Sequence, residues 1–317
     1  IGNVFGRLPG SGSELPVVIS AHLDTVFPPG TDLDLRRGID KISGPGIGDN
    51  AIGLAGLIGL LWELQADQVP LASDLWLVAN VGEEGLGDLC GMREVVQRFE
   101  GRVKAYIVLE GMALGQVYHR GLGVRRYRIT VNTSGGHSWV DYGKRSAIHE
   151  LSSIISRLLE IEIPEEPRTT INVGVISGGT SVNTIASEAH LDLDLRSEHV
   201  ETLNSLEGSV KATLQEFRIP GVEVSEELIG DRPVGELSPT DPLVRLVVDR
   251  LASVGIKPRL NIGSTDANIP LSLGYPAVCL GLTTGNGAHT VNEYINIPPL
   301  EQGLKQLRLV IEGLDRD

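Results

Sequence analysis

The 317-residue chain contains only two cysteines, Cys90 and Cys279, and each lies in an apolar stretch without a CxxC spacing. Two such residues do not make a disulfide framework, and they do not supply the clustered thiolates of a structural zinc site. A reducing compartment is the default for such a chain, so we expect a cytoplasmic location.

Basic residues are also scarce, because 27 Lys and Arg stand against 41 Asp and Glu, which gives a net charge of −14. Nucleic acids and anionic membranes are bound by clustered Lys and Arg, so we expect neither as a partner. No apolar run in the sequence reaches the roughly 18 residues of a membrane-spanning helix. The chain begins at Ile1 without Met, in a strand-like segment. We therefore expect further residues upstream, which leaves a signal peptide open.

The first part of the chain alternates β-branched apolar runs with segments of helical length. Predicted strands and helices follow one another in the order 15–24, 49–65, 74–81, 88–99 and 103–111. Strands that alternate with helices at this spacing indicate a mostly parallel, doubly wound sheet with helices on both faces. The same pattern resumes near the end of the chain, at 241–253, 276–282 and 300–313.

The middle of the chain has a different pattern, in which polar and apolar residues alternate along the strands. Its predicted elements are 124–133, 144–160, 171–179, 189–198, 200–217 and a short strand near 222. Strand-helix-strand-strand-helix-strand is the order of a ferredoxin-like α+β sandwich. We therefore predict an α/β fold in which segments 1–117 and 231–317 form one domain and 118–230 is an inserted one.

The segment AHLDTV places His22 and Asp24 two residues apart at the carboxyl end of a predicted strand. Their side chains leave the same face, at the edge where open α/β sheets bind ligands. A metal-binding imidazole commonly has its second nitrogen held by a carboxylate. A His and an Asp that satisfy one another at a strand end would give the same pattern, so both interpretations stay open.

Three further carboxylates follow predicted turns in the same region. Asp49 comes after three glycines in GPGIGDN and opens a helix, so it is either a ligand or a helix N-cap. Glu83 and Glu84 stand side by side after the second strand, in VGEEGLGD. Because consecutive side chains diverge, one can bind a metal while the other faces the water that the metal activates; exposed surface charge is the alternative.

Glu110 ends the third strand in IVLEGM, and His289 follows the last apolar strand in TTGNGAHTVNEY. Together with His22, Asp49 and Glu84, they are expected at the carboxyl ends of strands in one α/β layer. Three carboxylates are neutralised by two Zn²⁺ ions and a bridging hydroxide, so the ligand count favours two ions. Ligation by nitrogen and oxygen suits zinc, with Co²⁺ or Mn²⁺ as possible substitutes.

The segments AHLDTV, GPGIGDN, VGEEGLGD, LEG and GAHTVNEY, in this order, resemble the metal-site motifs of one family. It comprises dinuclear zinc exopeptidases and deacylases such as carboxypeptidase G, aminoacylase, succinyl-diaminopimelate desuccinylase and bacterial tripeptidase. GGHSW, DLRSE and GSTDANIP resemble its other signatures, so the resemblance covers essentially the whole chain. It implies that 1–117 and 231–317 form a catalytic domain and that 118–230 is a lid and dimerisation domain, which makes a homodimer the expected assembly.

The resemblance implies a role for each metal ligand. His22 would bind one zinc and His289 the other, Asp49 would bridge them, and Glu84 and Glu110 would complete one coordination sphere each.

The resemblance also implies roles for two neighbours of these ligands. Asp24 would orient His22, and Glu83 would be the general base. A cis peptide bond is expected after the bridging carboxylate, here between Asp49 and Asn50.

Three residues of the inserted segment are expected near the substrate. His137 in SGGHS resembles the lid histidine that stabilises the oxyanion, in dimeric members from the neighbouring subunit; a solvated turn histidine is the alternative. Arg196 in LDLDLRSE lies on the strand face opposite the leucines and could clamp a carboxylate bidentately, or pair with an aspartate of its own strand. Asn183 and the 263–268 loop are weaker candidates, again by resemblance, and Trp139 stands where a small residue is common.

The function expected from these residues is zinc-dependent hydrolysis of an amide bond next to a free carboxylate, in a small peptide or an N-acyl amino acid. A carboxypeptidase- or tripeptidase-like exopeptidase is the first hypothesis, and an N-acyl-amino-acid deacylase or aminoacylase is the alternative. An alternative of another class is a metal-free binding protein on the same scaffold. Such a protein would be expected to have lost ligands, and all five are present together with Glu83.

Overall fold

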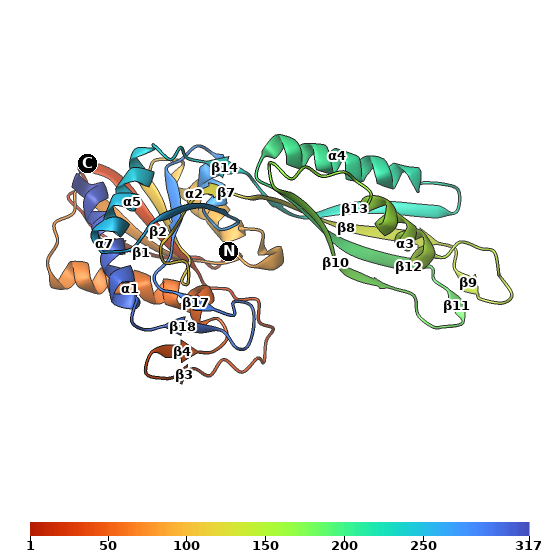
Figure 1. Cartoon of the computed structure of the whole chain (residues 1–317), viewed down its shortest axis with the longest axis horizontal. Helices are drawn as coiled ribbons and strands as arrows, with labels where there is room; N and C mark the ends of the chain where they lie inside the picture. Colours follow the sequence, from red (N-terminus) through yellow and green to blue (C-terminus); the bar gives the residue numbers. More distant parts are fainter. Residues whose placement is uncertain (317) are drawn as a thin grey trace. The chain divides into compact units, whose positions relative to one another are not determined.

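The computed structural model describes residues 1–316 and divides the chain into two compact units (Figure 1). The α/β unit consists of Ile1–Gly121 and Gly235–Asp317, and the inserted unit consists of Leu122–Val234. Both boundaries lie a few residues beyond the predicted ones. The first boundary lies later because β7 (Gln116–Gly121) pairs with strands of the α/β unit, and the second because β13 (Val222–Arg232) of the inserted unit continues past residue 230.

The sheet of the α/β unit is mostly parallel, as the sequence predicts. Its order is β1-β5-β2-β6-β16-β7-β14, with β15 also paired to β7. The pairs of β2 with β5 and β6, and of β16 with β6, are parallel, and the antiparallel pairs involve β1, β7 and β14. The bounds are β1 (Val4–Leu8), β2 (Glu14–His22), β5 (Ser73–Asn80), β6 (Ala105–Leu109), β14 (Gly235–Glu236), β15 (Arg259–Gly263) and β16 (Ala277–Leu280).

Helices cover both faces of this sheet, because the central strands are apolar on both sides. Along β6, Ile107 packs in one core with α1 (Ile52–Ala66), α5 (Pro242–Ser253) and α7 (Leu300–Arg316). Its neighbours Tyr106 and Val108 pack in a second core with α2 (Cys90–Phe99) and α6 (Asn268–Ser272). The predicted doubly wound α/β fold is confirmed.

The helical stretch Ile47–Ala66 is, within residues 1–316, the one long and apolar enough to cross a membrane by length and composition alone. In this structure Leu57, Leu60 and Leu64 of α1 are buried in the core against β2 and α7. A buried core helix has the same composition, and α1 occupies that place in the fold.

A small four-stranded sheet of very short strands, ordered β17-β18-β4-β3, also belongs to the α/β unit. Its members are β3 (Arg36–Arg37), β4 (Lys41–Ser43), β17 (Gly285–Asn286) and β18 (Tyr294–Asn296). The pairing of β18 with β4 joins the segment just before Asp49 to the segment just after His289. This sheet was not among the predicted elements.

The inserted unit is a ferredoxin-like sandwich, as predicted. Its antiparallel sheet has the order β10-β12-β8-β13. The elements follow one another as β8 (Gly123–Thr133), α3 (Ala147–Leu158), β10 (Thr169–Gly178), β12 (Glu188–Ser197), α4 (Val200–Glu216) and β13 (Val222–Arg232). The last strand is 11 residues long and not short as expected, because the exposed glutamates of this edge strand hide its apolar alternation.

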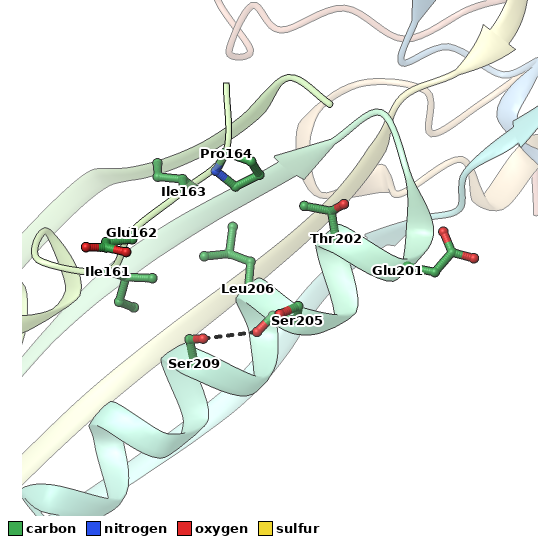
Figure 2. Close-up of a pocket in the computed structure, with 9 residues that line it drawn as sticks. All are labelled: Ile161, Glu162, Ile163, Pro164, Glu201, Thr202, Ser205, Leu206 and Ser209. Atoms are coloured by element: carbon green, nitrogen blue, oxygen red, sulfur yellow. Dashed lines mark hydrogen bonds between the residues drawn. The ribbon is translucent and has the colours of Figure 1, made fainter. Parts of the chain in front are cut away.

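Burial alternates along β12 and shows how the two faces of this sheet differ. Leu191, Leu193 and Leu195 are buried against α3 and α4. The intervening Asp192 and Asp194 lie on the opposite, helix-free face. Beside α4, a groove of about 320 Å³ separates Ile161 and Ile163 from the first turns of the helix (Figure 2). None of the predicted site residues lines this groove.

Candidate metal centre

The predicted ligands converge at the carboxyl edge of the large sheet. His22 is the last residue of β2, and Glu110 follows the last residue of β6. Glu84 lies in the turn after β5, and Asp49 lies in the turn that precedes α1. His289 comes from the loop between β17 and β18. The peptide bond Asp49–Asn50 is cis, as expected from the resemblance.

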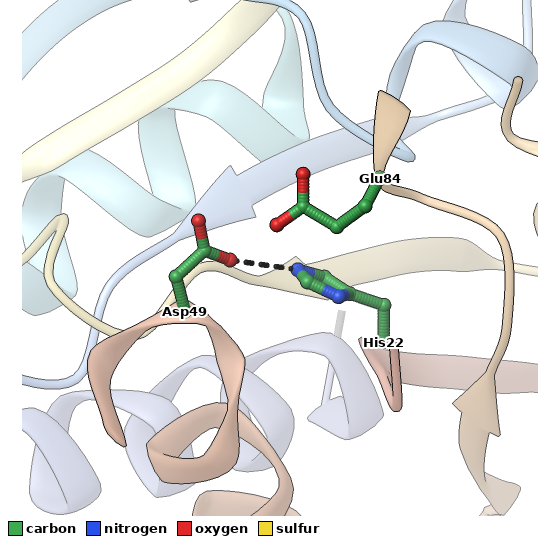
Figure 3. A group of neighbouring side chains, drawn as sticks. All are labelled: His22, Asp49 and Glu84. Carbon is green, nitrogen blue, oxygen red and sulfur yellow. Dashed lines mark ion pairs between the residues drawn. The ribbon is translucent and has the colours of Figure 1, made fainter. Parts of the chain in front are cut away.

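Asp49 lies between the two histidines. Its Oδ1 is 3.0 Å from Nε2 of His22, and its Oδ2 is 3.0 Å from Nε2 of His289. The same nitrogen of His289 lies 3.5 Å from Oε1 of Glu84. Figure 3 shows the side chains of His22, Asp49 and Glu84 pointing toward one another. Each oxygen of one carboxylate therefore faces a different imidazole.

The chemistry of the donor atoms fits a divalent metal ion. His22, Asp49 and Glu84 each offer a ligand atom, and these atoms lie within 4.8 Å of one another. Nε2 of His22 and Oε1 of Glu84 are buried, and their contacts to Asp49 and His289 are electrostatic only, without the geometry of a hydrogen bond. A buried polar atom without a partner is costly, so an additional partner is expected at this point. A cation held by nitrogen and oxygen donors satisfies both atoms at once.

The electrostatics of the cluster show an excess of negative charge. Burial alone would lower the pKa of His22, but the adjacent Asp49 carboxylate and the charges of Glu110, Glu83 and Asp266 raise it to about 11. Glu110 as a residue is only half-buried, yet loss of water around its carboxyl raises the pKa to about 8. Burial, followed by the charge of Asp49, also raises the pKa of Glu84. The site thus favours any added positive charge, whether a proton or a metal ion.

Asp24 lies beside His22, and its backbone carbonyl is nearer to the imidazole than its carboxylate is. Nδ1 of His22 is 2.9 Å from the backbone carbonyl of Asp24, and the carboxylate is farther away, at 3.7 Å. The carboxylate instead accepts N–H groups from Gly82, Glu83 and Glu84, at 2.8, 3.2 and 2.8 Å. The main chain of Asp24 orients His22, and its side chain fixes the turn that carries the two glutamates. The predicted general base, Glu83, is buried in this turn.

Two buried acids near the site escaped the sequence analysis as individuals. Asp266, in the 263–268 loop, accepts a 2.7 Å hydrogen bond from Nδ2 of Asn80, and its charge contributes to the raised pKa of His22. Glu293 is fully buried and accepts three backbone N–H groups of the Asp49 turn. Its position within GAHTVNEY was the available signal, but an isolated loop acid has no distinctive pattern.

His137 and Asn183 lie together in the inserted unit. The short strands β9 (Gly136–His137) and β11 (Thr184–Ile185) are paired, and the N–H of Ser138 donates to the carbonyl of Asn183 at 3.0 Å. Nδ1 of His137 accepts the N–H groups of Trp139 and Val140, at 3.2 and 3.3 Å. An imidazole that accepts at Nδ1 carries its proton on Nε2, so the exposed His137 is a hydrogen-bond donor there.

Arg196 is not part of this group. Its Nε lies 2.6 Å from Oδ1 of Asp194, and Oδ2 of the same carboxylate accepts from Nε of Arg126 at 3.0 Å. It stands near the end of β12, whereas the β9 and β11 segments adjoin the start of β12 through Ser187 and Glu188. Along an extended strand these positions are roughly 25 Å apart. The three predicted substrate contacts therefore occupy two separate places within the inserted unit.

The fold and the convergent histidines and carboxylates define a hydrolase of the metal-dependent class. Residues 18–313 match the sequence model of peptidase family M20/M25/M40, and the chain belongs to this family. Its members hydrolyse peptides or N-acyl amino acids, and this chain is an enzyme of that family.

Relatives in the family carry several different names. The chain is 25% identical over 317 residues to the uncharacterized protein YqjE of Bacillus subtilis, with 98% of this chain and 83% of that protein covered. It is 25% identical over 307 residues to a putative succinyl-diaminopimelate desuccinylase of Mycobacterium tuberculosis, with 94% and 82% covered. A tripeptidase structure from Staphylococcus aureus has a TM-score of 0.81 at 21% identity, covering 99% of this chain and 85% of that one.

Proposed function

We propose that this protein is a dinuclear zinc hydrolase that cleaves an amide bond in a small peptide or an N-acyl amino acid, next to a free carboxylate. One observation carries the proposal: the two oxygens of Asp49 each lie 3.0 Å from a different imidazole. A carboxylate placed in this way can hold two ions at once. A single ion would leave the three ligand carboxylates incompletely neutralised.

The proposed ligands divide between two positions. Asp49 is shared, His289 lies beside Glu84, and His22 interacts electrostatically with Glu110. His22 and Glu110 would hold one Zn²⁺, and His289 and Glu84 the other, with Co²⁺ or Mn²⁺ as possible substitutes. When bound, the ions supply an acidified water and polarisation of the scissile carbonyl.

The chain's own groups then handle the proton and the oxyanion. Glu83 is buried beside the ligand Glu84 and accepts the proton of the attacking water, which it passes to the leaving amine. His137 donates from Nε2 to the developing oxyanion, consistent with its hydrogen bonds at Nδ1. Asn183, beside His137, is the proposed additional contact to the substrate.

The geometry of the inserted unit supports a homodimer in this proposal. His137 and Arg196 occupy separate places roughly 25 Å apart, which is more than a dipeptide or an acyl amino acid can span. If both contact one substrate, they come from different copies of the chain. We therefore propose that the inserted unit mediates dimerisation and that Arg196 binds the substrate carboxylate.

Two substrate classes remain, and each has support. The putative desuccinylase among the relatives favours an N-acyl amino acid. The fold shared with a tripeptidase is compatible with a small peptide, which is our first proposal. The two free cysteines support a cytoplasmic location, which is part of the proposal.

Metal analysis and a substrate screen test the proposal. Purified protein loaded with zinc is expected to hold about two ions per chain, and the loaded protein is then assayed against dipeptides, tripeptides and N-acyl amino acids. Absence of bound metal under every loading condition would refute the hydrolase and favour a metal-free binding protein. A full complement of metal with turnover of acyl amino acids alone would select the deacylase.

A further inference from the structure

The turn Gly44–Asp49, which carries the bridging carboxylate, has most of its N–H groups directed at one buried side chain. Oε1 of Glu293 accepts the N–H groups of Gly48 and Asp49, each at 2.7 Å, and Oε2 accepts that of Gly46 at 3.0 Å. The carbonyl of Glu293 accepts the N–H of Gly44 at 2.9 Å. One residue therefore receives four hydrogen bonds from this turn.

The side chain of Glu293 has no exposed surface, and its partners among the described residues are backbone N–H groups and not Lys or Arg. A buried carboxylate without a cation is tolerated when several N–H groups donate to it. Gly46, at φ +73, adopts the left-handed conformation that turns successive N–H groups toward one point. Such glycine-rich turns commonly bind phosphate. Here Glu293 already takes those donors, so the turn is an internal anchor.

Glu293 also belongs to the loop of the second histidine. The N–H of Glu293 donates to the carbonyl of Thr290, and the N–H of Thr290 donates to that of Gly287, so His289 is enclosed in the same turn. On the other side of Asp49, Nδ2 of Asn50 donates to the carbonyl of Leu109 at 2.7 Å, and Oδ1 of Asn50 accepts the N–H of Gly111 at 3.2 Å. The bridging residue is thus fixed from both sides.

We propose that Glu293 is a positioning residue that holds the Asp49 turn against the His289 loop, so that the two oxygens of Asp49 face the two imidazoles before any metal binds. This inference rests on the proposed function for its meaning in catalysis. Its structural content, the anchoring of the turn, stands independently. It predicts that loss of the anchor weakens metal binding more than it weakens the fold.

The experiment uses the full chain and compares the wild type with Glu293→Gln. The amide keeps the shape but presents an NH₂ group to one of the three N–H donors. Zinc affinity, measured by competition with a chelator, is expected to fall about 10- to 100-fold, the usual effect of losing a group that orients a ligand. Hydrogen exchange of the metal-free protein is expected to accelerate in the segment 44–52 and not elsewhere.

The matched control is Asp315→Asn. The carboxylate of Asp315 accepts the N–H groups of Ala72 and Ser73, each at 2.8 Å, in the same unit but outside the cluster. Its replacement is expected to leave zinc affinity and exchange in 44–52 unchanged. A general loss of stability would affect both variants alike, so equal zinc affinities in the two would overturn the proposal.

Glu293→Asp keeps the charge but is too short to reach all three donors. A positioning role predicts weakened zinc binding for this variant also, whereas a purely electrostatic role predicts wild-type affinity and would overturn the proposal. This variant decides the question if Glu293→Gln does not fold. Failure of the wild type to bind zinc would refute the proposed function instead, while exchange in 44–52 would still test the anchor.

Discussion

The two units of the molecule both contain clusters of carboxylates, yet the clusters have opposite electrostatic character. On the open face of the inserted unit, Asp192 lies 2.8 Å from Nε of Arg128, and this hydrogen bond lowers the pKa of the carboxyl. Burial would raise the pKa of Asp194, but the hydrogen bonds to Arg196 and Arg126 lower it overall. In the α/β unit, burial raises the pKa of Glu84 and Glu110 instead; burial would also raise that of Asp49, but the two neighbouring imidazoles lower it.

The difference shows how structural and functional acids can be told apart. Asp192 and Asp194 each have a guanidinium in register on the adjacent strand, Arg128 and Arg126, so their charges are compensated. Among the described residues, the cationic groups beside the proposed ligands Asp49, Glu84 and Glu110 are the imidazoles of His22 and His289, which are proposed ligands themselves. Carboxylates paired with guanidinium groups stabilise a sheet, whereas buried carboxylates without such a pair favour the binding of a cation.

The largest expected effect comes from replacing the proposed base. Glu83→Gln is expected to lower kcat about 10²- to 10⁴-fold, because the amide cannot accept the proton of the attacking water. Zinc content should stay at the wild-type level, since Glu83 is not a proposed ligand. Glu84→Gln is the matched neighbour and should lose zinc. Full activity of Glu83→Gln, measured with zinc content on the same sample, would remove Glu83 from its role.

Much of this architecture could be predicted from the sequence, because its regular elements are long and strongly patterned. The apolar run that ends in His22 and the alternation of Leu191, Leu193 and Leu195 identify buried strands and their faces. Placing His22, Glu84 and Glu110 at one edge then follows from the parallel sheet alone. Their actual approach to Asp49 and His289 depends on loops, for which the family resemblance and not periodicity was informative.

The remaining features depend on contacts that leave no pattern in a sequence. Strands of two or three residues, such as β3 and β17, are too short to show alternation. Hydrogen bonds to the backbone involve no particular partner residue, which is why the roles of Glu293 and of the Asp24 carbonyl were missed. The distance between His137 and Arg196 could not be predicted, because it depends on the path that β12 and its neighbouring loops take in the folded chain.

The second effect in size is the pH dependence of metal affinity. Zinc must displace the protons held by His22 and Glu110, whose pKa values are raised to about 11 and about 8. Each displaced proton makes affinity rise about tenfold per pH unit. We therefore expect a rise of about 100-fold per unit below pH 8, and of about tenfold per unit above it. Chelator competition between pH 6 and 9 measures this, and a pH-independent affinity would contradict the cluster electrostatics.

A smaller effect is expected from the predicted carboxylate clamp. Arg196→Gln should raise KM for substrates with a free carboxylate about tenfold, because a charge-assisted hydrogen bond is lost, and leave kcat nearly unchanged. Arg128→Gln is the matched control, since it breaks an ion pair with Asp192 on the same sheet face. Equal KM values for the two variants would show that Arg196 serves only its pairing with Asp194.

The smallest effect is the most direct test of the comparison, because the same chemical change is made in both units. In metal-free protein at pH 9, Asp194→Asn should lower the free energy of unfolding by about 1 kcal/mol, at the low end for a charged hydrogen bond because the pair is half-exposed. The folded pKa of Asp194 is lowered, so its stabilising contribution is present above the ordinary pKa and is lost only as pH falls.

Glu110→Gln should change stability in the opposite direction. The folded pKa of Glu110 is raised to about 8, so its contribution declines as pH rises from about 4.5 and is least favourable at pH 9. The neutral amide removes that penalty and should stabilise the metal-free protein, by about 1 kcal/mol in urea unfolding with a chelator present. Added zinc should reverse the sign at Glu110 alone, because a ligand is then missing. Destabilisation by Glu110→Gln without metal would mean that this acid is already compensated, as those of the inserted unit are.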